Sequence, residues 1–374
     1  MTGAPAGPAS RGPGARSARG APVGEAAPAG GAAGDDADLR AARRARVFEA
    51  MGDAGLDVLV LGRRDDVAYA TGARSLWTAG TRPFGAACVL VGGGEATHLL
   101  STWDAGVPPE IPFEHLYGVT WNPVVMARAL GAIPGLAGAR RVGVDAWSPG
   151  FARALGRLAP DADLVPADDL VRSVRTVKLP VEVERIAAAC AVARAAVAAA
   201  VAALGDGAGP GADRPDVGAA RAAALRALAG GGGLVPTTGL VVDAADGPRG
   251  PGPIHVDAGV LVDGYEGGAG RTVEVGSAAP ASGDDGPAAD AQRRVREACV
   301  AGAAGADLAS AAAGVDAWHV RGSGMGYEPP VVAPGLGAAA VLAPGTVLSV
   351  AVEVAGDRRR QLVLVGAAGP ARPL

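Results

Sequence analysis

The sequence predicts two domains of different class, an α/β domain followed by an α+β domain. In the first half, up to about residue 170, apolar strand-like runs alternate with helical segments. In the second half, two Ala-rich helical segments are followed by several apolar runs separated by turn residues. A chain of 374 residues is long enough for two ordinary domains, each with its own core.

The chain begins with a segment that offers little to bury. Residues 1–36 consist largely of Ala, Gly, Pro and Arg, so they cannot offset the entropy of ordering and are expected to form a disordered tail. The segment has no apolar run of the kind that a secretory signal needs. We therefore expect the first domain to span residues 37–170.

The first domain is predicted from four segments in order. Residues 39–55 (LRAARRARVFEAMGDAG) form a basic amphipathic helix, and 56–62 (LDVLVLG) form a strand. Residues 87–100 (ACVLVGGGEATHLL) give two strands around a Gly turn, which indicates a hairpin. Residues 140–158 (RRVGVDAWSPGFARALGRL) give a strand followed by a helix.

The second domain, residues 171–374, begins with helices and continues with strands. Pro180 opens a helix that runs to Leu204, residues 205–217 break the chain, and 218–229 form a second helix. Five apolar runs are expected to be strands: LVPTTGLVVDA (234–244), IHVDAGVLVDGY (254–265), RTVEVG (271–276), AVLAPGTVLSVAVEV (340–354) and RQLVLVGAAG (360–369).

Composition excludes several classes of function. The formal net charge of −4 gives no basic field that would attract nucleic acid or an anionic membrane. The three cysteines stand far apart without a CxxC pair, which argues against a disulfide framework and a thiolate zinc site and favours the cytoplasm. The Ala-rich stretch 186–204 is flanked by charges and is expected to be a helix of a soluble protein.

One stretch carries the candidate chemistry, HVDAGVLVDGYEGGAGRT at residues 255–272. His255 and Asp257 are two residues apart, so on a strand they share one face. The GYEGGAGRT segment that follows is rich in turn residues and nearly free of metal ligands. We interpret the stretch as a hairpin that delivers one carboxylate and lacks a second.

From about residue 41 to 372 the chain resembles the creatinase and Xaa-Pro aminopeptidase (prolidase-like) superfamily. The resemblance is carried by five segments in the expected order: LDVLVLGRRDDVAYATG, VRTVKLPVEVERIAAACAVA, VDAGVLVDGYEGGAGRTVEVG, GYEPP at 326–330, and APGTVLSVAVEV followed by QLVLV. It implies a creatinase-like first domain, a second domain with the pita-bread fold, and a homodimer.

The resemblance also implies where metal ligands should stand. Metal-dependent members hold two divalent ions with two Asp, one His and two Glu, a site that activates water and polarises a carbonyl. The matching positions here are Asp257, Gly268, Ser323, Ala351 and Arg360, so one ligand of five remains. The nearby carboxylates Glu266 and Glu353 lack an imidazole partner, and Arg360 adds a repelling cation. We expect no cofactor, with Mn, Co or Zn bound only if the site is retained after all.

Creatinase, which the chain resembles, hydrolyses its substrate without metal, so a metal-free reaction is also considered. His255 and His319 are the candidate bases, with Asp257 as the group that orients His255. Further candidates for the cavity are Glu328, Glu353, Arg271 and Tyr265. Each has a structural alternative: a histidine satisfied by a carbonyl, a retained turn carboxylate, a solvated charge or a hairpin stabiliser.

Three hypotheses for function follow. The first is a family homologue that has lost metallopeptidase activity and binds a small molecule or a peptide. The second is a metal-independent enzyme acting on a small amide, amidine or biosynthetic intermediate. The third is a residual Xaa-Pro peptidase. In every case we expect a cytoplasmic protein that binds neither nucleic acid nor membrane.

Overall fold

The computed structural model describes residues 33–73, 88–100, 106–118, 122–146, 148–206, 216–233, 239–244, 252–275 and 285–374. Most of the expected tail therefore lies outside the described residues, as do 276–284 and 207–215. The first helix, α1 (Ala33–Asp53), begins inside the segment expected to be disordered. Its early residues are held because the Asp36 carboxylate pairs with Arg185 of the second domain.

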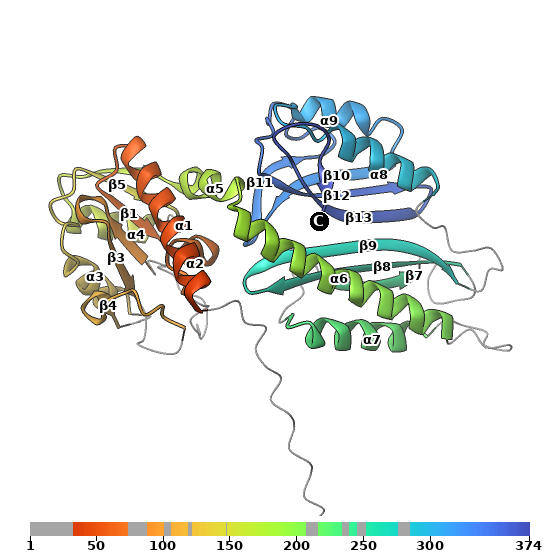
Figure 1. Ribbon diagram of the computed structural model, residues 1–374. Helices are drawn as coiled ribbons and strands as arrows, with labels where there is room; N and C mark the ends of the chain where they lie inside the picture. The colour runs from red at the N-terminus through yellow and green to blue at the C-terminus, as the bar shows by residue number, and fades with distance from the viewer. Residues whose placement is uncertain are drawn as a thin grey trace, which may run out of the picture.

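The first domain is a six-stranded sheet with helices on both faces (Figure 1). The strand order is β4-β3-β2-β1-β5-β6. The strands are β1 (Val58–Leu61), β2 (Cys88–Val91), β3 (Ala96–Leu100), β4 (Leu116–Tyr117), β5 (Arg141–Val144) and β6 (Asp163–Pro166). The helices that follow α1 are α2 (Arg64–Thr71), α3 (Pro123–Gly131), α4 (Pro149–Leu158) and α5 (Asp168–Thr176). Helices α1, α2 and α5 share one core with β1, and α3 and α4 share the other, which confirms the α/β prediction.

The second domain is built on an eight-stranded sheet of order β11-β10-β12-β13-β9-β8-β7, with β14 paired to β13. Its strands are β7 (Leu240–Ala244), β8 (Gly252–Val262), β9 (Tyr265–Val275), β10 (Ala317–Ser323), β11 (Tyr327–Val332), β12 (Val347–Val354), β13 (Asp357–Leu364) and β14 (Arg372–Pro373). Its helices are α6 (Pro180–Asp206), α7 (Val217–Gly230), α8 (Pro287–Ala298) and α9 (Gly305–Ala311). Helices and an antiparallel sheet are segregated, so the α+β prediction is confirmed.

The helices cover the two halves of this sheet separately. Figure 1 shows α6 and α7 against β7–β9, and α8 and α9 against β10, β12 and β13. The two halves meet where β13 pairs with β9, over a register of Arg359 to Gln361 against Arg271 to Ala269. Because side chains alternate along a strand, each strand gives one set to the helices and the other set to the opposite face.

The hairpin that the sequence analysis singled out is more regular than expected. The GYEGGAGRT segment is mostly strand, because β9 runs without interruption from Tyr265 to Val275. Only Asp263 and Gly264 form the turn, with φ of 49° and 85°. Asp-Gly with two positive φ angles is the favoured two-residue hairpin turn, a signal that the glycine-rich sequence after it obscured.

The segment that contains His319 and the GYEPP sequence is also a hairpin. β10 and β11 pair directly, with a register shift between Arg321 and Gly322. The connection between them is held against β9, since the Glu266 N–H donates to the Gly324 carbonyl at 2.7 Å. The end of β10 therefore closes over the start of β9 at one end of the curved sheet.

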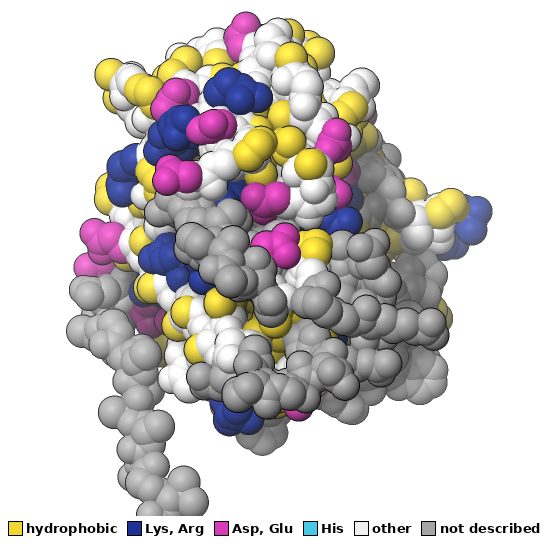
Figure 2. All heavy atoms as spheres, turned by 90° about the vertical axis from the view of Figure 1, so that its right-hand side faces the viewer, with side chains coloured by type: hydrophobic (Ala, Val, Ile, Leu, Met, Phe, Trp, Pro, Cys, Tyr) yellow, Lys and Arg dark blue, Asp and Glu magenta, His cyan; other side chains and the backbone are white. Residues whose placement is uncertain are grey.

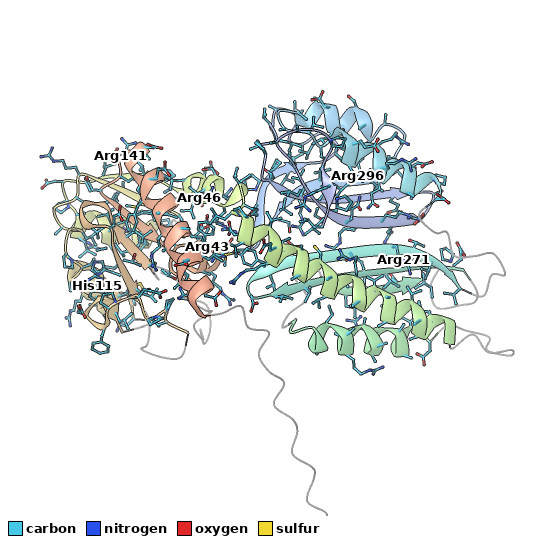
Figure 3. All side chains as sticks on the ribbon, viewed as in Figure 1. Arg43, Arg46, His115, Arg141, Arg271 and Arg296 are labelled. Carbon is cyan, nitrogen blue, oxygen red and sulfur yellow. The ribbon has the colours of Figure 1, made fainter. Side chains whose placement is uncertain are left out.

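Buried ionic contacts join the two domains. The Arg43 guanidinium lies 5.3 Å from the ring centre of Tyr69 and 5.2 Å from that of Tyr265, and it pairs with Glu182 at 3.3 Å. Figure 3 shows Arg43 and Arg46 on α1 where it faces the second domain. Each ring belongs to a different domain, so Arg43 is clamped between them.

A second junction is formed around Arg175 of α5. Its guanidinium donates to Asp65 at 2.8 Å and Asp66 at 2.5 Å in the first domain, and to Glu328 of β11 at 3.2 Å. The surrounding carboxylates raise the pKa of Arg175 although burial opposes this shift. Lys178 also donates to Glu328, and burial lowers the pKa of Lys178. The junction pairs buried acidic side chains of both domains with buried basic ones, which favours one relative placement of the domains.

Helix α6 is, by length and composition, able to cross a membrane. In the structure its Ala193, Ala196 and Ala200 are buried against β8, β9 and α7. One side of α6 is therefore part of the core of the second domain. The described cysteines Cys88, Cys190 and Cys299 are free and buried, each in a different core cluster.

Candidate functional site

The register of the second sheet places the family positions on one face, here called the inner face. Val256, Ala258, Val350 and Val352 pack against the helices, so the residues that alternate with them, Asp257 and Ala351 among them, point to the opposite side. One row of directly paired residues crosses five strands on this inner face. It consists of His319, Ala351, Arg360, Gly270 and Asp257.

Arg360 and Asp257 form a two-point ion pair at the centre of the row. Arg360 Nε donates to Asp257 Oδ2 at 2.8 Å, and Arg360 Nη2 donates to Oδ1 at 2.5 Å. Nη2 also donates to the Ala258 carbonyl at 2.9 Å. The one family carboxylate that remains in the sequence therefore serves as the partner of an internal arginine.

The Arg360 guanidinium also fills the space beside Gly268. A Cβ placed on Gly268 would lie 2.3 Å from Arg360 Nη1 and 2.8 Å from its Cζ. A side chain at position 268 would therefore require the Arg360 guanidinium to move from its present place. Positions 268 and 360 are two of the five at which the resemblance implies a metal ligand, and the Arg360 side chain occupies the space at both.

A second internal arginine closes the other end of the inner face. Arg321 Nη1 donates to Glu266 Oε2 at 2.9 Å, and Nη2 also pairs with Glu266. The Ser323 hydroxyl, at the position of the family histidine, donates to the same Oε2 at 3.0 Å. Arg321, Glu266 and Ser323 are all buried. Glu266 does turn inward, but its charge is neutralised by Arg321.

His255 lies on the inner face two residues from Asp257, as the alternation predicts. Its Nδ1 lies 3.5 Å from the Thr272 hydroxyl, whereas both carboxylate oxygens of Asp257 accept hydrogen bonds from Arg360. Burial lowers the pKa of His255, and the neighbouring Asp257 only partly opposes this effect. The imidazole is therefore neutral near pH 7, and the carboxylate that would orient it is held by the arginine.

The opposite end of the inner face is open to solvent. His319 is exposed, and Ala351 and Glu353 are half-buried. Glu353 lies on the same face as Ala351, as expected, and accepts a hydrogen bond from Arg358 Nε at 2.8 Å. Each of the three carboxylates that we considered as remaining ligands, Asp257, Glu266 and Glu353, is thus paired with an arginine.

Three predicted site residues lie elsewhere. Arg271 pairs in register with Val256 and Arg359, so it points away from the inner face, and Figure 3 shows it on β9. Tyr265 is buried among α6 residues, and its hydroxyl donates to Glu182 at 3.0 Å. Glu328 accepts hydrogen bonds from Arg175, from Lys178 and from the Met325 N–H, so it belongs to the domain junction.

Sequence reasoning missed Arg321, which holds Glu266. The signal was the alternation HVRGS, where His319, Arg321 and Ser323 stand at every second position. That spacing puts the three side chains on one face only if the segment is a strand, and the segment is not among the five strands that we expected. The fold then brings the strand to Glu266, which is 55 residues away in the chain.

The inner face does not fit a pair of divalent cations. Among the described residues no group of three or more His, Cys, Asp or Glu side chains is placed to hold a metal ion. The positions where cations would sit next to Asp257 are lined by Arg360, and Glu266 is held by Arg321. Guanidinium groups at these distances repel divalent cations, so we derive no metal-assisted step here.

Comparisons with known proteins agree with this architecture. Residues 43–177 match the creatinase/prolidase N-terminal domain. The prolidase from Pyrococcus horikoshii is similar in structure, with TM-score 0.65, 18% identity and coverage of 89% of this chain and 97% of the prolidase. No curated protein sequence matches the chain.

Two further solved structures show the same two-domain fold. The dipeptidase PepE from Mycobacterium ulcerans has TM-score 0.64 and 22% identity, covering 91% of this chain and 96% of its own. The Xaa-Pro aminopeptidase from Thermotoga maritima has TM-score 0.67 and 14% identity, covering 88% and 96%. These structures cover nearly the whole chain, and they confirm the pita-bread architecture of its second domain.

Proposed function

We propose that this chain, which has a creatinase/prolidase N-terminal domain and the two-domain fold of prolidases, lacks dinuclear metallopeptidase activity and binds a small molecule or peptide on its inner face. The observation that carries the proposal is the ion pair between Arg360 and Asp257. It uses the remaining family carboxylate and blocks the space beside Gly268. The pairing with Asp257 and the filling of the space beside Gly268 both come from the Arg360 side chain.

The electrostatics of the inner face support this proposal. A dinuclear centre needs several uncompensated carboxylates, because their charge offsets that of two divalent ions. Here Asp257, Glu266 and Glu353 are matched by Arg360, Arg321 and Arg358. The charge of the carboxylates is therefore already balanced by the protein itself.

A metal-independent enzyme is the second hypothesis, and the geometry favours it less. A general base benefits from a carboxylate that orients its imidazole. Asp257 faces Arg360, and the ring of His255 contacts a threonine hydroxyl. The third hypothesis, a residual Xaa-Pro peptidase, requires the metal site that Arg360 occupies.

We further propose a cytoplasmic homodimer that interacts with neither nucleic acid nor membrane. Three free buried thiols support a reducing compartment. In the face shown in Figure 2 the described acidic and basic side chains lie interspersed, without a single-sign patch that would attract a polyanion. Light scattering at micromolar concentration tests the dimer, and a monomer would contradict it.

The first prediction tests the proposal through metal content. Protein purified and dialysed under mild conditions is expected to carry well under one Mn, Co or Zn per chain by elemental mass spectrometry. Xaa-Pro dipeptides incubated with added Mn²⁺ are expected to remain intact, because no hydroxide is generated on the inner face. Two tightly bound ions per chain, or Mn²⁺-stimulated cleavage, would overturn the proposal.

A combined variant sharpens this test. Changing Gly268→Asp, Ser323→His, Ala351→Glu and Arg360→Glu together restores every family ligand type. Ser323 is fully buried against Glu266 and Arg321, so a histidine there must displace their ion pair. We therefore expect the fourfold variant to gain little metal unless Arg321 is also replaced by a neutral residue.

A further inference from the structure

Two buried carboxyl groups meet in the first domain where β1 and β5 end. Asp145 directly follows β5, and Asp66 lies in the first turn of α2, the helix that follows β1. Both side chains are buried, and the two carboxyl groups are in hydrogen-bonding contact. Two carboxylates in contact and away from water repel each other strongly, so the pair holds one proton between its members.

The other contacts of the pair place this proton on Asp145. Asp66 accepts a hydrogen bond from the Arg175 guanidinium at 2.5 Å, which favours its ionised form. Asp145 accepts from the uncharged N–H groups of Gly62 and Arg63, at 2.6 and 3.1 Å. The Asp145 carboxyl group is therefore the weaker acid, and its hydroxyl donates to Asp66.

The other charged and titratable groups around Asp145 compensate its charge little. The Arg63 guanidinium is half-exposed and pairs with Asp168 at 2.6 Å. Cys88 of β2 is buried, and burial, with Asp145 as a second cause, raises the pKa of its thiol, which Arg44 of α1 only partly opposes. A charge that forms on Asp145 therefore acts mainly on its carboxylate partner and on the cation that this partner holds.

Arg175 is that cation, and it connects the pair to the second domain. Its Nη1 donates to Asp66 and to Asp65, and its Nη2 donates to Glu328 of β11 at 3.2 Å, the longest of the three bonds. Glu328 also accepts a hydrogen bond from Lys178. One guanidinium is therefore shared by carboxylates of both domains, and its bond to the second domain is the weakest that it makes to them.

We propose that the proton shared by Asp145 and Asp66 is a pH-sensitive switch of the contact between the two domains. When the proton leaves, two adjacent carboxylates attract Arg175, which moves toward the first domain and weakens its hydrogen bond to Glu328. Glu328 also accepts from the Met325 N–H, in the connection between β10 and β11 that closes one end of the inner face. The domains therefore separate more readily at higher pH, and that end of the inner face is released with them.

The direction of the pH effect follows from proton binding. With the junction closed, burial above all raises the pKa of Asp145 to about 7. An open junction admits water to Asp66 and Arg175, so the pKa of Asp145 falls toward that of an exposed carboxyl group, about 4. The proton thus stabilises the closed arrangement. This stabilisation is complete below about pH 4 and is lost as the pH rises through about 7, by up to about tenfold per pH unit in the ratio of open to closed molecules.

Single-molecule energy transfer between two dyes, one on each domain, tests the switch in the full chain. The dyes are attached through Ala132→Cys, at the end of α3, and Ala309→Cys, in α9. Both alanines are exposed, whereas the three native cysteines are buried and stay unlabelled. We expect the ratio of open to closed molecules to rise at least about tenfold between pH 5 and pH 8 and to stay constant above pH 8.

Two amide variants locate the titrating group. Asp145→Asn is neutral at every pH and can still donate to Asp66, so its ratio of open to closed molecules should change by less than about twofold between pH 5 and pH 8. Asp57→Asn is the matched control, because Asp57 accepts from the N–H groups of Arg140 and Arg141 at the opposite end of β1 and β5. This variant should keep the tenfold rise.

Circular dichroism at each pH separates opening of the junction from unfolding. A constant ratio of open to closed molecules in the original protein would reject the switch without requiring any Asp145 variant to fold. An equal rise in Asp145→Asn would reject it too, and so would an open fraction that matches the unfolded fraction at every pH. The titrating pair stands apart from the five family ligand positions, so these outcomes do not depend on the metal content of the inner face.

Discussion

The ion pair between Arg360 and Asp257 lies at the centre of the inner face. The hydrogen bonds of Arg360 include two to Asp257 and one to the Ala258 carbonyl, and both partners of the ion pair are largely buried. A charged pair in such a place is stable only if both members remain. Replacing Arg360 by a metal ion as the partner of Asp257 would therefore first require the buried ion pair to break, which is unfavourable.

Removal of Arg360 alone is predicted to be costly. Arg360→Gln leaves Asp257 buried and without its cation, so the free energy of unfolding should fall by about 2 to 4 kcal/mol. Arg358→Gln, which breaks the exposed pair with Glu353, is the matched control and should cost about 0 to 1 kcal/mol. Urea denaturation at pH 7 measures both.

The same residue offers a second comparison. Replacing both partners, Arg360→Met with Asp257→Leu, removes the charges together and should recover most of the lost stability. If the double change were as damaging as the single one, packing of the arginine rather than its charge would be responsible.

Asp145 carries the clearest pH dependence in the first domain. Its buried carboxyl group accepts hydrogen bonds from the Gly62 and Arg63 N–H groups at 2.6 and 3.1 Å and lies in hydrogen-bonding contact with Asp66. Burial above all, and then Asp66, raise the pKa of Asp145 to about 7. Because the folded state binds the proton more tightly than the unfolded chain, this group makes stability fall as pH rises from about 4 to 7.

Asp145→Asn removes this titration and keeps one acceptor oxygen, so it loses one of the two N–H contacts at every pH. Relative to the variant, the original protein should lose on the order of 1 to 3 kcal/mol of stability between pH 5 and pH 8. Urea midpoints measured at several pH values give the difference. A gap that does not change with pH would show that Asp145 is ionised throughout.

At the scale of elements, hairpins set the inner face. β8 and β9 stay in register over eleven pairs because a two-residue Asp-Gly turn joins them, and glycines in β9 allow neighbours to approach closely. A Cβ on Gly267 would lie 2.1 Å from the Ala189 carbonyl carbon of α6. The glycine-rich sequence of β9 therefore reflects close packing against a helix, not a loop.

Gly267→Ala is predicted to be strongly destabilising. The added methyl meets helix backbone, which has no rotamer to change, so the free energy of unfolding should fall by about 3 kcal/mol. Gly252→Ala, at the start of β8, has open space and should change stability by less than about 1 kcal/mol. Thermal and urea denaturation of the two variants provide the comparison, and equal effects would contradict the packing argument.

These hairpins also mark what the sequence can and cannot predict. The alternation of His255 and Asp257 fixed their shared face, and the apolar runs located β8, β12 and β13 in part. The glycine-rich residues 266–270 were expected to belong to a turn because glycine normally disfavours strands, but tertiary packing overrides that preference and they form the middle of β9. The pairing of Arg321 with Glu266 depends on how the sheet curls, which local sequence does not encode.

At the scale of the molecule, the domains are joined by charges that water does not reach. Arg175 contacts Asp65 and Asp66 on one side and Glu328 on the other, and Arg175, Asp66 and Glu328 are buried. Such a junction is expected to make the domains unfold together. If one domain unfolded alone, the charged side chains left on the other would stay partly buried without their partners, which is unfavourable.

Arg175→Met is predicted to uncouple the domains. It leaves Asp65 and Asp66 without their cation and Glu328 with Lys178 alone, so stability should fall by about 3 to 5 kcal/mol and the single thermal transition should divide into two. Arg172→Met on the same helix, whose pairs are more exposed, is the matched control and should keep one transition. One sharp transition in Arg175→Met, observed by calorimetry, would show that other contacts hold the domains together.

The three buried cysteines can report which part of the protein unfolds locally, because each thiol reacts only when it becomes exposed. Cys88 lies in the sheet of the first domain, Cys190 in α6 and Cys299 after α8. Each thiol is therefore buried in a different core cluster. Burial raises the pKa of all three, to about 12 for Cys299, and keeps them as unreactive thiols while folded. A brief pulse of alkylating reagent followed by peptide mass spectrometry would therefore report, position by position and without any engineered label, which core opens first.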